Sequence, residues 1–308
     1  MKVLYIAGWG RSGTTILDNI LGSYDSVFTT GELFYLWRRG LNQGRRCGCG
    51  AKLPRCRTWQ EILEVAYADH ELNPKHTAAV QRRTVRVRDT RRLSRAGLVG
   101  AGLVGEAARY RDEIGRIYAA IGTVTGAELI VDSSKVPSGA AVLAQIPGVD
   151  SFLVQMVRDP RAVAYSWMRP KQQPDVKVAR AMDSHGAVES AANWVAWNML
   201  IEGLAGSWFA GRSRRLRYED FVADPRGIAE SLLGFTGTRW SSGPFQDAAT
   251  VRLPANHTVS GNPSRFRTGP VALRCDDDWR TDQQWSPRVL STAISLPLLR
   301  RYGYPVAA

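Results

Sequence analysis

A glycine-rich turn, GWGRSGTTIL at residues 8–17, directly follows the apolar run VLYIA and is the first stretch suited to chemistry. Backbone N–H groups of a strand–loop–helix turn, together with the positive end of the following helix, bind an anion without any side chain. The glycines allow a tight path, and two threonines add hydroxyl donors. The predicted contacts to an anion are Gly10, Arg11, Ser12, Gly13, Thr14 and Thr15.

The turn keeps the Gly-x-x-x-x-Gly spacing of a phosphate-binding loop but has Thr14 where such loops carry a lysine. In nucleotide triphosphatases that lysine reaches the β and γ phosphates, and the next hydroxyl holds magnesium. Here Arg11 is the nearest cation, which favours an anion bound without a metal-bridged triphosphate. The alternatives are a turn with no ligand and a P-loop kinase or nucleotidase, which needs the missing lysine.

A second candidate site is VRDPRAVAYSWM at 157–168, at the end of an apolar strand. Asp159 and Pro160 are typical of a helix start, because proline at the first helical position loses no hydrogen bond. Arg158 then lies at the strand tip and Ser166 two turns into the helix. An arginine and a serine that converge there suit a phosphate dianion.

The elements that must position these residues follow from hydrophobic periodicity. Apolar runs predict buried strands at 3–8, 128–132 and 151–157, with a more polar candidate at 214–218. Helix-like stretches lie at 14–22, within 59–120, and at 137–145, 160–168 and 187–205. Strands that alternate with helices predict an α/β fold with a mostly parallel central sheet flanked by helices, and ligands gather at the carboxyl ends of its strands.

Two segments depart from this alternation. Residues 40–125 hold three of the four cysteines and a basic run, and we expect a mainly helical insertion or lid within a single domain spanning 1–308. From residue 250 onward, proline, glycine, asparagine and arginine predict a long functional loop before a closing helix near 286–301.

Composition indicates a soluble globular protein whose partners are anionic. The 308 residues carry a formal net charge of +13, mostly as arginine, whose planar fork matches phosphate and sulfate. The basic run QRRTVRVRDTRRLSR at 81–95 is expected to be a solvated helix face, with a polyanion or membrane-surface patch, or a nucleic-acid-binding protein, as the alternatives. The short apolar stretch near the start is too short for a secretory signal, so the cytosol is the expected compartment.

Four motifs in order resemble the sulfotransferases that use 3'-phosphoadenosine-5'-phosphosulfate (PAPS), a P-loop-like family, and in particular its bacterial and carbohydrate-type members. GRSGTT is similar to the 5'-phosphosulfate loop, and RDPRAVAYS to the 3'-phosphate motif. RYED at 217–220 resembles the segment whose tyrosine lies near the adenine, and RFRTG at 265–269, followed by DDW, resembles the C-terminal phosphate clamp. The resemblance implies cofactor contacts from Arg158, Ser166, Tyr218, Arg267, Thr268 and Gly269, with Thr268 in place of the usual lysine.

The resemblance implies transfer of a sulfuryl group from PAPS to a hydroxyl of a glycan, glycolipid or secondary metabolite, with no metal needed for the chemistry and the 40–125 segment shaping the acceptor pocket. Glu32, in TTGELFYLW, is the predicted base, and a carboxylate at a helix N-terminus is its alternative role. Lys135, in VDSSKVPS, and Arg11 are the predicted cations near the sulfonate. Asp132 and the following serines suit an N-cap equally well.

Histidine and cysteine leave further possibilities open. His257 is the one histidine near a matched motif and a candidate catalytic partner or alternative base, whereas His70, His76 and His185 are expected at the surface. Cys47, Cys49 and Cys56 suggest a metal site with Cys275 as fourth ligand, but a one-residue gap is shorter than structural zinc sites prefer, so no metal is predicted and free thiols or a disulfide are favoured. The acceptor and the oligomeric state, a homodimer included, stay open.

Overall fold

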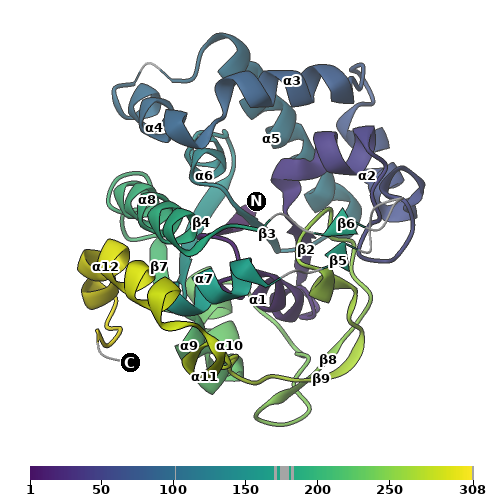
Figure 1. The fold of residues 1–308 in the computed structure, drawn as a ribbon. Helices are drawn as coiled ribbons and strands as arrows, with labels where there is room; N and C mark the ends of the chain where they lie inside the picture. The colour runs from purple at the N-terminus through teal and green to yellow at the C-terminus, as the bar shows by residue number, and fades with distance from the viewer. Residues whose placement is uncertain (101, 170–171, 174–179, 182–183, 307–308) are drawn as a thin grey trace.

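A computed structural model describes residues 1–100, 102–169, 172–173, 180–181 and 184–306 (Figure 1). Five parallel strands form the central sheet, which confirms the predicted α/β fold with its mostly parallel sheet. Their order is β2 (Val27–Gly31), β3 (Leu129–Lys135), β1 (Lys2–Ala7), β4 (Asp150–Val157) and β7 (Ser213–Arg217).

The strand β1 lies at the centre of the sheet and is apolar on both faces, as expected for a parallel strand covered by helices on either side. Val3 and Tyr5 pack into the core on one face, and Leu4 and Ile6 into the core on the other. In register, Ala7 lies beside Lys135 of β3 on one side and beside Gln155 of β4 on the other. The chain segments that follow these strands therefore meet at one edge of the sheet.

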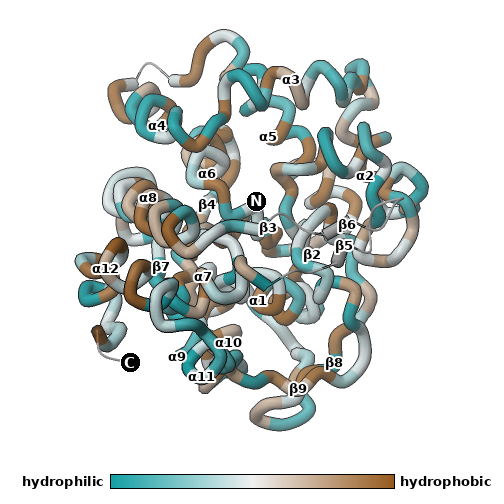
Figure 2. Tube along the Cα trace, in the orientation of Figure 1, coloured by the Kyte–Doolittle hydropathy of each residue, from teal (hydrophilic) through white to brown (hydrophobic). Residues whose placement is uncertain are grey.

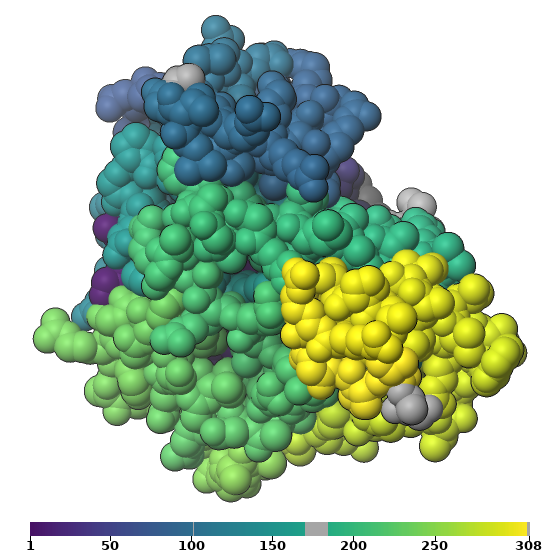
Figure 3. All heavy atoms as spheres, turned by 90° about the vertical axis from the view of Figure 1, so that its left-hand side faces the viewer, coloured from purple at the N-terminus to yellow at the C-terminus, as the bar shows by residue number. Residues whose placement is uncertain are grey.

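The helices that follow the strands begin and end close to their predicted bounds, which confirms those predictions. They are α1 (Thr14–Leu21), α6 (Pro137–Leu143), α7 (Pro160–Met168), α8 (Ala187–Ala205) and the closing helix α12 (Trp285–Arg301). Helices that the sequence analysis did not predict are α9 (Tyr218–Ala223), α10 (Pro225–Phe235) and α11 (Trp279–Asp282). Figure 3 shows α12 in yellow beside α8 in green, consistent with their extensive packing.

The insertion at 40–125 is mainly helical, as predicted. Its longer helices are α2 (Arg57–Ala66), α3 (Pro74–Thr84), α4 (Thr90–Leu98) and α5 (Gly105–Thr125). Trp59 and Ile117 of this insertion share one core with Val3 and Ile130 of the sheet, so the insertion covers one sheet face. Both hydrophilic and hydrophobic residues occur along α3 and α4 (Figure 2), and Ala78, Val80 and Leu93 are buried, as expected for amphipathic helices with one face on the core.

The basic run at 81–95 forms the solvated helix face that its pattern predicts. Val85 and Leu93 point into the core, while the arginines of the run are exposed. Exposed ion pairs join Arg83 to Glu106 and Arg86 to Asp89. These pairs offset part of the local positive charge. Throughout the described chain, every helix is too short or too polar to cross a lipid bilayer.

The segment from 250 onward is more ordered than the predicted long loop. A hairpin of β8 (Thr250–Leu253) and β9 (Gly269–Ala272) encloses the segment 254–268, which contains the short helix η5 (Pro263–Phe266). The loop prediction was wrong at these strands, because their pairing is set by tertiary contact rather than by local propensity. A second small sheet pairs β5 (Gln172–Gln173) with β6 (Arg180–Ala181).

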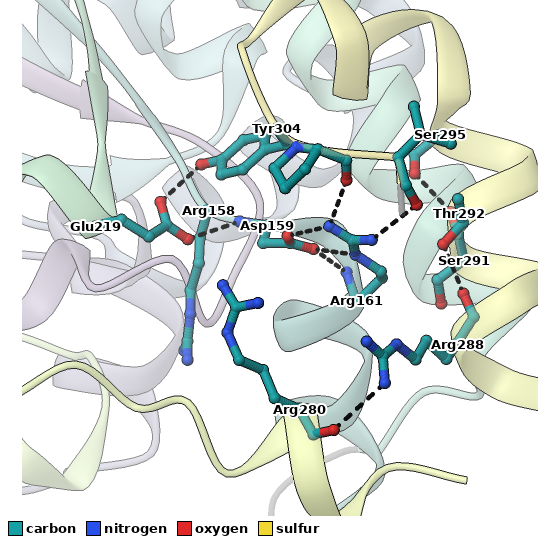
Figure 4. A network of polar contacts seen from close by, with 12 residues as sticks. Arg158, Asp159, Arg161, Glu219, Arg280, Arg288, Ser291, Thr292, Ser295 and Tyr304 are labelled. Carbon is teal, nitrogen blue, oxygen red and sulfur yellow. Dashed lines mark hydrogen bonds and ion pairs between the residues drawn. The ribbon is translucent and has the colours of Figure 1, made fainter. Parts of the chain in front are cut away.

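A buried arginine fixes the C-terminal tail behind the start of α7 (Figure 4). The Arg161 guanidinium donates to both carboxylate oxygens of Asp159, at 2.9 and 2.7 Å, and to the carbonyl oxygens of Pro305 and Val306. Asp159 is also the N-cap of α7, accepting from the Arg161 backbone N–H at 2.9 Å. Tyr304 donates to Glu219, whose carboxylate also accepts from the Asp159 backbone. This network holds the strand tip that carries Arg158.

We expect Arg161→Ala to lower the free energy of unfolding by about 3–5 kcal/mol, because it leaves the Asp159 carboxylate buried without its partner. Arg212→Ala is the matched control: its ion pair with Asp150 is exposed, and it should cost about 0–1 kcal/mol. Urea unfolding followed by circular dichroism measures both. Equal costs for the two variants would contradict a structural role for the buried pair.

Candidate active site

A cavity of about 520 Å³ opens at the carboxyl edge of the sheet, between the glycine-rich turn and the strand tips of β2, β3 and β4. Most of the residues predicted from sequence line it together. They are Gly10, Arg11, Gly13, Thr14, Thr15, Glu32, Lys135, Arg158, Ser166, Tyr218 and Arg267. Segments far apart in the chain thus converge on one hollow, rich in basic side chains, of the size of a small-molecule site.

The glycine-rich turn connects β1 to α1 along a path that ordinary side chains would obstruct. Gly13 has a φ of +83°, and a Cβ atom there would lie 2.4 Å from the Tyr218 ring. A Cβ atom at Gly10 would lie 2.6 Å from the Trp167 ring. The backbone of the turn lies so close to these two aromatic rings that only glycine fits at both positions. This path leaves the N-terminal end of α1 facing the site.

The ends of β2 and β3 bring together a carboxylate and an amine. Lys135 forms an ion pair with Glu32, and its backbone has a φ of +72°. The second Glu32 oxygen lies 3.5 Å from the Arg39 guanidinium and accepts from the Ser260 hydroxyl at 3.3 Å. The Glu32 side chain is 12% exposed, so these contacts surround it almost completely.

Two opposing effects set the protonation of Glu32. Burial alone raises the pKa of the Glu32 carboxyl, whereas the charges of Lys135 and Arg39 and the hydrogen bonds from Lys135 and Ser260 lower it. The lowering effects dominate, so the pKa of Glu32 lies below its usual value. The free protein therefore holds Glu32 as a carboxylate at neutral pH, in the state that accepts a proton.

Arg158, directly after β4, is held by backbone and aromatic contacts and by an ion pair with Asp276, whose carboxylate lies 3.3 Å from the guanidinium. Its guanidinium donates to the carbonyl oxygen of Arg11 at 3.2 Å and to that of Asp276 at 2.8 Å. It also stacks over the Tyr218 ring, 4.5 Å from the centroid, and its side chain is only 6% exposed. Its Nε has no partner among the described residues. This cation is positioned in advance at the cavity wall that Ser166 shares.

An aromatic wall, formed by Trp9, Trp167, Trp197 and His185, also lines the cavity. The rings of Trp9 and Trp197 lie 4.7 Å apart, and those of Trp167 and His185 lie 4.5 Å apart. Arg11 stacks on Trp167, 4.7 Å from the ring centroid. Sequence patterns did not predict this wall, although Trp9 and Trp167 lie inside the two motifs at 8–17 and 157–168.

His185 is a correction to the sequence prediction. It is half-buried and lines the cavity, because it precedes α8, which packs on α7 beside Trp167. His70 and His76 are exposed, as predicted. Arg39 and Ser260 were also missed, since nothing in the sequence shows that they flank Glu32.

Several predicted residues lie away from the cavity. Ser12 is buried, with its hydroxyl donating to the Trp9 carbonyl oxygen at 2.8 Å. Thr268 and Gly269 lie at the start of β9 and are not among the lining residues. His257 is also outside the lining, and its ring contacts Cys47, Cys56 and Thr58. The structure therefore does not bring His257 together with Glu32.

Two other predictions also change. The N-cap of α6 is Val136 rather than Asp132 or the serines, because β3 continues through Lys135. Asp132 instead accepts from the Tyr118 hydroxyl at 2.6 Å and from the Ser134 backbone at 2.8 Å.

None of the described residues between 40 and 125 lines the cavity, so the expected contribution of this insertion to an acceptor pocket stays a prediction.

Comparisons with known proteins point in one direction. The family described as "Sulfotransferase family" matches residues 4–242. Carbohydrate sulfotransferase 3 of Homo sapiens is 24% identical over 179 residues, a match that covers 54% of this chain and 36% of the human protein. The chain thus covers about a third of the length of that curated relative.

Two solved structures match along almost the whole chain. The sulfotransferase domain from the curacin biosynthetic pathway has a TM-score of 0.56 at 17% identity, covering 99% of this chain and 98% of that chain. The sulfotransferase domain from the Synechococcus PCC 7002 olefin synthase has a TM-score of 0.55 at 18% identity, with 99% and 96% covered. At these identities the matches establish a shared fold.

A carboxyl group lies buried in α1, directly below the glycine-rich turn. Asp18 is 1% exposed. Burial raises the pKa of Asp18 to about 7, although the nearby Thr29 and Ser133 side chains act to lower it. Near neutral pH this group is poised between its protonated and charged forms, so it links the stability of the turn to pH.

The wild type should lose stability as the pH rises from about 4 to 7, because the unfolded chain loses the Asp18 proton in this window while the folded protein keeps it. Asp18→Asn lacks this proton, so we expect its free energy of unfolding to rise relative to that of the wild type over the same window. The advantage should level off above the folded-state pKa, at on the order of 1–4 kcal/mol. Urea unfolding across this pH range measures it. An advantage that does not vary with pH would contradict the assignment.

Proposed function

Because this chain belongs to the sulfotransferase family, we propose that it transfers a sulfuryl group from PAPS to a hydroxyl of an acceptor. The observation that carries the proposal is the Glu32–Lys135 pair, which lies in the same cavity as the glycine-rich turn and Arg158. One cavity thus holds a carboxylate for a proton, an amine for a developing charge and two separate sites for anionic groups.

The residues present fit a donor with two anionic ends. The glycine-rich turn, with Thr14 and Thr15, suits a 5'-phosphosulfate, since the end of α1 attracts negative charge. At the other end, Arg158 and Ser166 suit a 3'-phosphate, and the buried Nε of Arg158 still lacks a partner among the described residues. Tyr218 lies between these ends, against both Gly13 and Arg158. Arg267 also lines the cavity, whereas no contact is assigned to Thr268 or Gly269.

Glu32 is the base in this proposal. When the acceptor oxygen bonds to sulfur, the bond between sulfur and the 5'-phosphate oxygen breaks, and the acceptor hydroxyl loses its proton. The carboxylate form of Glu32, maintained by Lys135 and Arg39, receives that proton. Arg39 and Ser260 keep one carboxylate oxygen oriented, so the other oxygen performs the transfer.

Lys135 and Arg11 supply positive charge near the reacting bonds. Lys135 is fixed at the end of β3, and in the free protein its amine is occupied by Glu32. A sulfonate in the cavity competes with Glu32 for this amine, which frees the carboxylate for the proton. Arg11 lies in the turn itself. Burial lowers the pKa of Arg11, and the negative charge of Glu32 acts in the opposite direction. The two cations therefore act on the leaving phosphate oxygen and the sulfonate together.

The acceptor in this proposal is a glycan, a glycolipid or a secondary metabolite. The aromatic wall supports an acceptor with a flat or apolar face, because indole rings pack well against such faces. The human relative is named a carbohydrate sulfotransferase, which favours the glycan class within this set. We propose the cytosol as the site of action.

Transfer of radiolabelled sulfate from PAPS to a panel of polysaccharides, glycolipids and phenols tests the function. We expect Glu32→Gln to lower the turnover by about 10²–10⁴-fold while the affinity for 3'-phosphoadenosine-5'-phosphate (PAP) stays nearly unchanged. Glu64→Gln, on the exposed face of α2, is the control and should keep full activity. Wild-type turnover in Glu32→Gln would remove Glu32 as the base, and magnesium-dependent ATP hydrolysis without use of PAPS would overturn the function.

We expect Arg158→Ala to weaken PAP binding by about 10- to 150-fold, which corresponds to the loss of one charge-assisted hydrogen bond, and to change turnover at saturation far less. Isothermal titration calorimetry with PAP measures the affinity. The control is Arg301→Ala, which removes an exposed arginine on α12. Equal affinities in the wild type and Arg158→Ala would refute the assignment of this arginine to the donor.

A further inference from the structure

Three cysteines and one histidine gather outside the cavity, where the insertion meets the segment 254–268. The four residues are Cys47, Cys49, Cys56 and His257, and one ligand atom from each lies within 4.8 Å of all the others. Cys47 and Cys56 are buried, His257 is half-buried and Cys49 is exposed. His257 thus joins cysteines that lie 201 and 210 positions away in the chain, and the four residues form one compact group of metal-binding atoms.

The separations match those between the ligands of a tetrahedral metal. The Sγ atoms of Cys49 and Cys56 lie 3.7 Å apart, and His257 Nδ1 lies 3.3 Å from Cys56 Sγ and 3.9 Å from Cys47 Sγ. A tetrahedral Zn²⁺ with ordinary bond lengths places two sulfurs about 3.8 Å apart and a sulfur and a nitrogen about 3.6 Å apart. The group therefore needs little rearrangement to close around a zinc ion.

The local fold explains how a one-residue gap delivers two ligands. Residues 46–52 form a tight turn, in which the Cys47 N–H donates to the Ala51 carbonyl oxygen at 2.8 Å and the Gly50 N–H donates to that of Cys47 at 2.8 Å. Gly48 packs so closely that a Cβ atom there would lie 1.8 Å from the Asn256 side chain. Only glycine fits between the two cysteines, and it lets the turn lie against the chain that carries His257.

His257 takes the place that the sequence analysis gave to Cys275. Cys275 is exposed and lies by Tyr218 and Asp276, on a different surface. The second ring nitrogen of His257 lies 3.3 Å from the Thr58 hydroxyl, and its carbonyl oxygen accepts from the Trp59 indole at 2.6 Å. Metal-bound histidines commonly use their other nitrogen in such a hydrogen bond, which orients the ring.

A buried cation stands beside the cluster. The Arg265 guanidinium donates to the carbonyl oxygens of Arg46 and Thr258, at 2.6 and 2.8 Å, which are the chain neighbours of Cys47 and His257. Three thiolates and a neutral histidine around Zn²⁺ carry one net negative charge. Arg265 supplies a positive charge in the same buried region, and such a charge favours the anionic, metal-bound form of the cluster.

We propose that Cys47, Cys49, Cys56 and His257 bind one Zn²⁺ ion in a structural site. Four protein ligands fill the tetrahedral shell and leave no position for a substrate, which separates this site from the chemistry in the cavity. A disulfide would use two of the three thiols and leave the third sulfur and the histidine without a function. Convergence of all four groups therefore favours the metal.

The ion would connect the insertion to the floor of the cavity. Directly after His257, the Val259 N–H donates to the Thr30 carbonyl oxygen, and the Ser260 carbonyl oxygen accepts from the Glu32 N–H at 3.0 Å. Gly48, in the cysteine turn, donates to the Thr258 carbonyl oxygen at 2.9 Å. Zinc at the cluster thus fixes the segment whose Ser260 hydroxyl orients Glu32.

Metal analysis tests this site without a donor or an acceptor. We expect the protein, purified under reducing conditions without chelators, to contain about one zinc per chain by inductively coupled plasma mass spectrometry. Cys56→Ser and His257→Ala should lose most of it. Cys275→Ser, the matched control outside the cluster, should keep it. Because a cluster variant can fail to fold, Co²⁺ exchange into the wild type gives a second measurement, with the visible bands of tetrahedral thiolate-bound cobalt expected.

Three outcomes would overturn the proposal. The first is a wild-type protein that is free of zinc and binds neither Zn²⁺ nor Co²⁺ on reconstitution. The second is equal zinc content in Cys275→Ser, Cys56→Ser and the wild type. The third is a disulfide between two of the cluster cysteines, found by peptide mapping of protein purified without oxygen. None of these depends on whether the cavity transfers sulfate.

Discussion

The ion pair between Glu32 and Lys135 is the contact on which the arrangement of the site depends. It joins the ends of two adjacent strands, β2 and β3, so the sheet register decides whether the two side chains meet. Beside it, β1 pairs with β3 through a register shift that ends with Ala7 opposite Lys135. The glycine-rich turn starts at the next residue. The register of β1, β2 and β3 therefore sets the distances between the carboxylate, the amine and the anion-binding turn.

The positive charges around Glu32 offset the effect of burial on the pKa of its carboxyl group. A carboxylate with 12% exposure would otherwise hold its proton more tightly, and a protonated Glu32 could not act as a base. Lys135 and Arg39 reverse that effect. The same cations weaken Glu32 as a base while they remain close, so the proposed function needs a competing anion in the cavity. The donor sulfonate meets this requirement, which links donor binding to readiness for proton transfer.

The sequence was sufficient for the parts of the site that sit inside one strand–turn–helix unit. Gly13, Thr14, Arg158 and Ser166 each belong to a local pattern, and periodicity also predicted the strands and helices that carry them. Contacts made by tertiary packing were not predictable. Arg39 and Ser260 reach Glu32 from different segments, and the aromatic wall forms only when α8 packs on α7. His257 was assigned to the wrong neighbourhood for the same reason, because spacing alone cannot show a partner 200 residues away.

A crystal structure of the protein with PAP bound would test the central claim most directly. The account predicts the 5'-phosphate within hydrogen-bonding distance of the backbone N–H groups of Gly13, Thr14 and Thr15, and the 3'-phosphate in contact with Arg158 and Ser166. It also predicts Glu32 facing the position of the transferred group. PAP bound outside this cavity, or bound with its 3'-phosphate on the glycine-rich turn, would contradict the account.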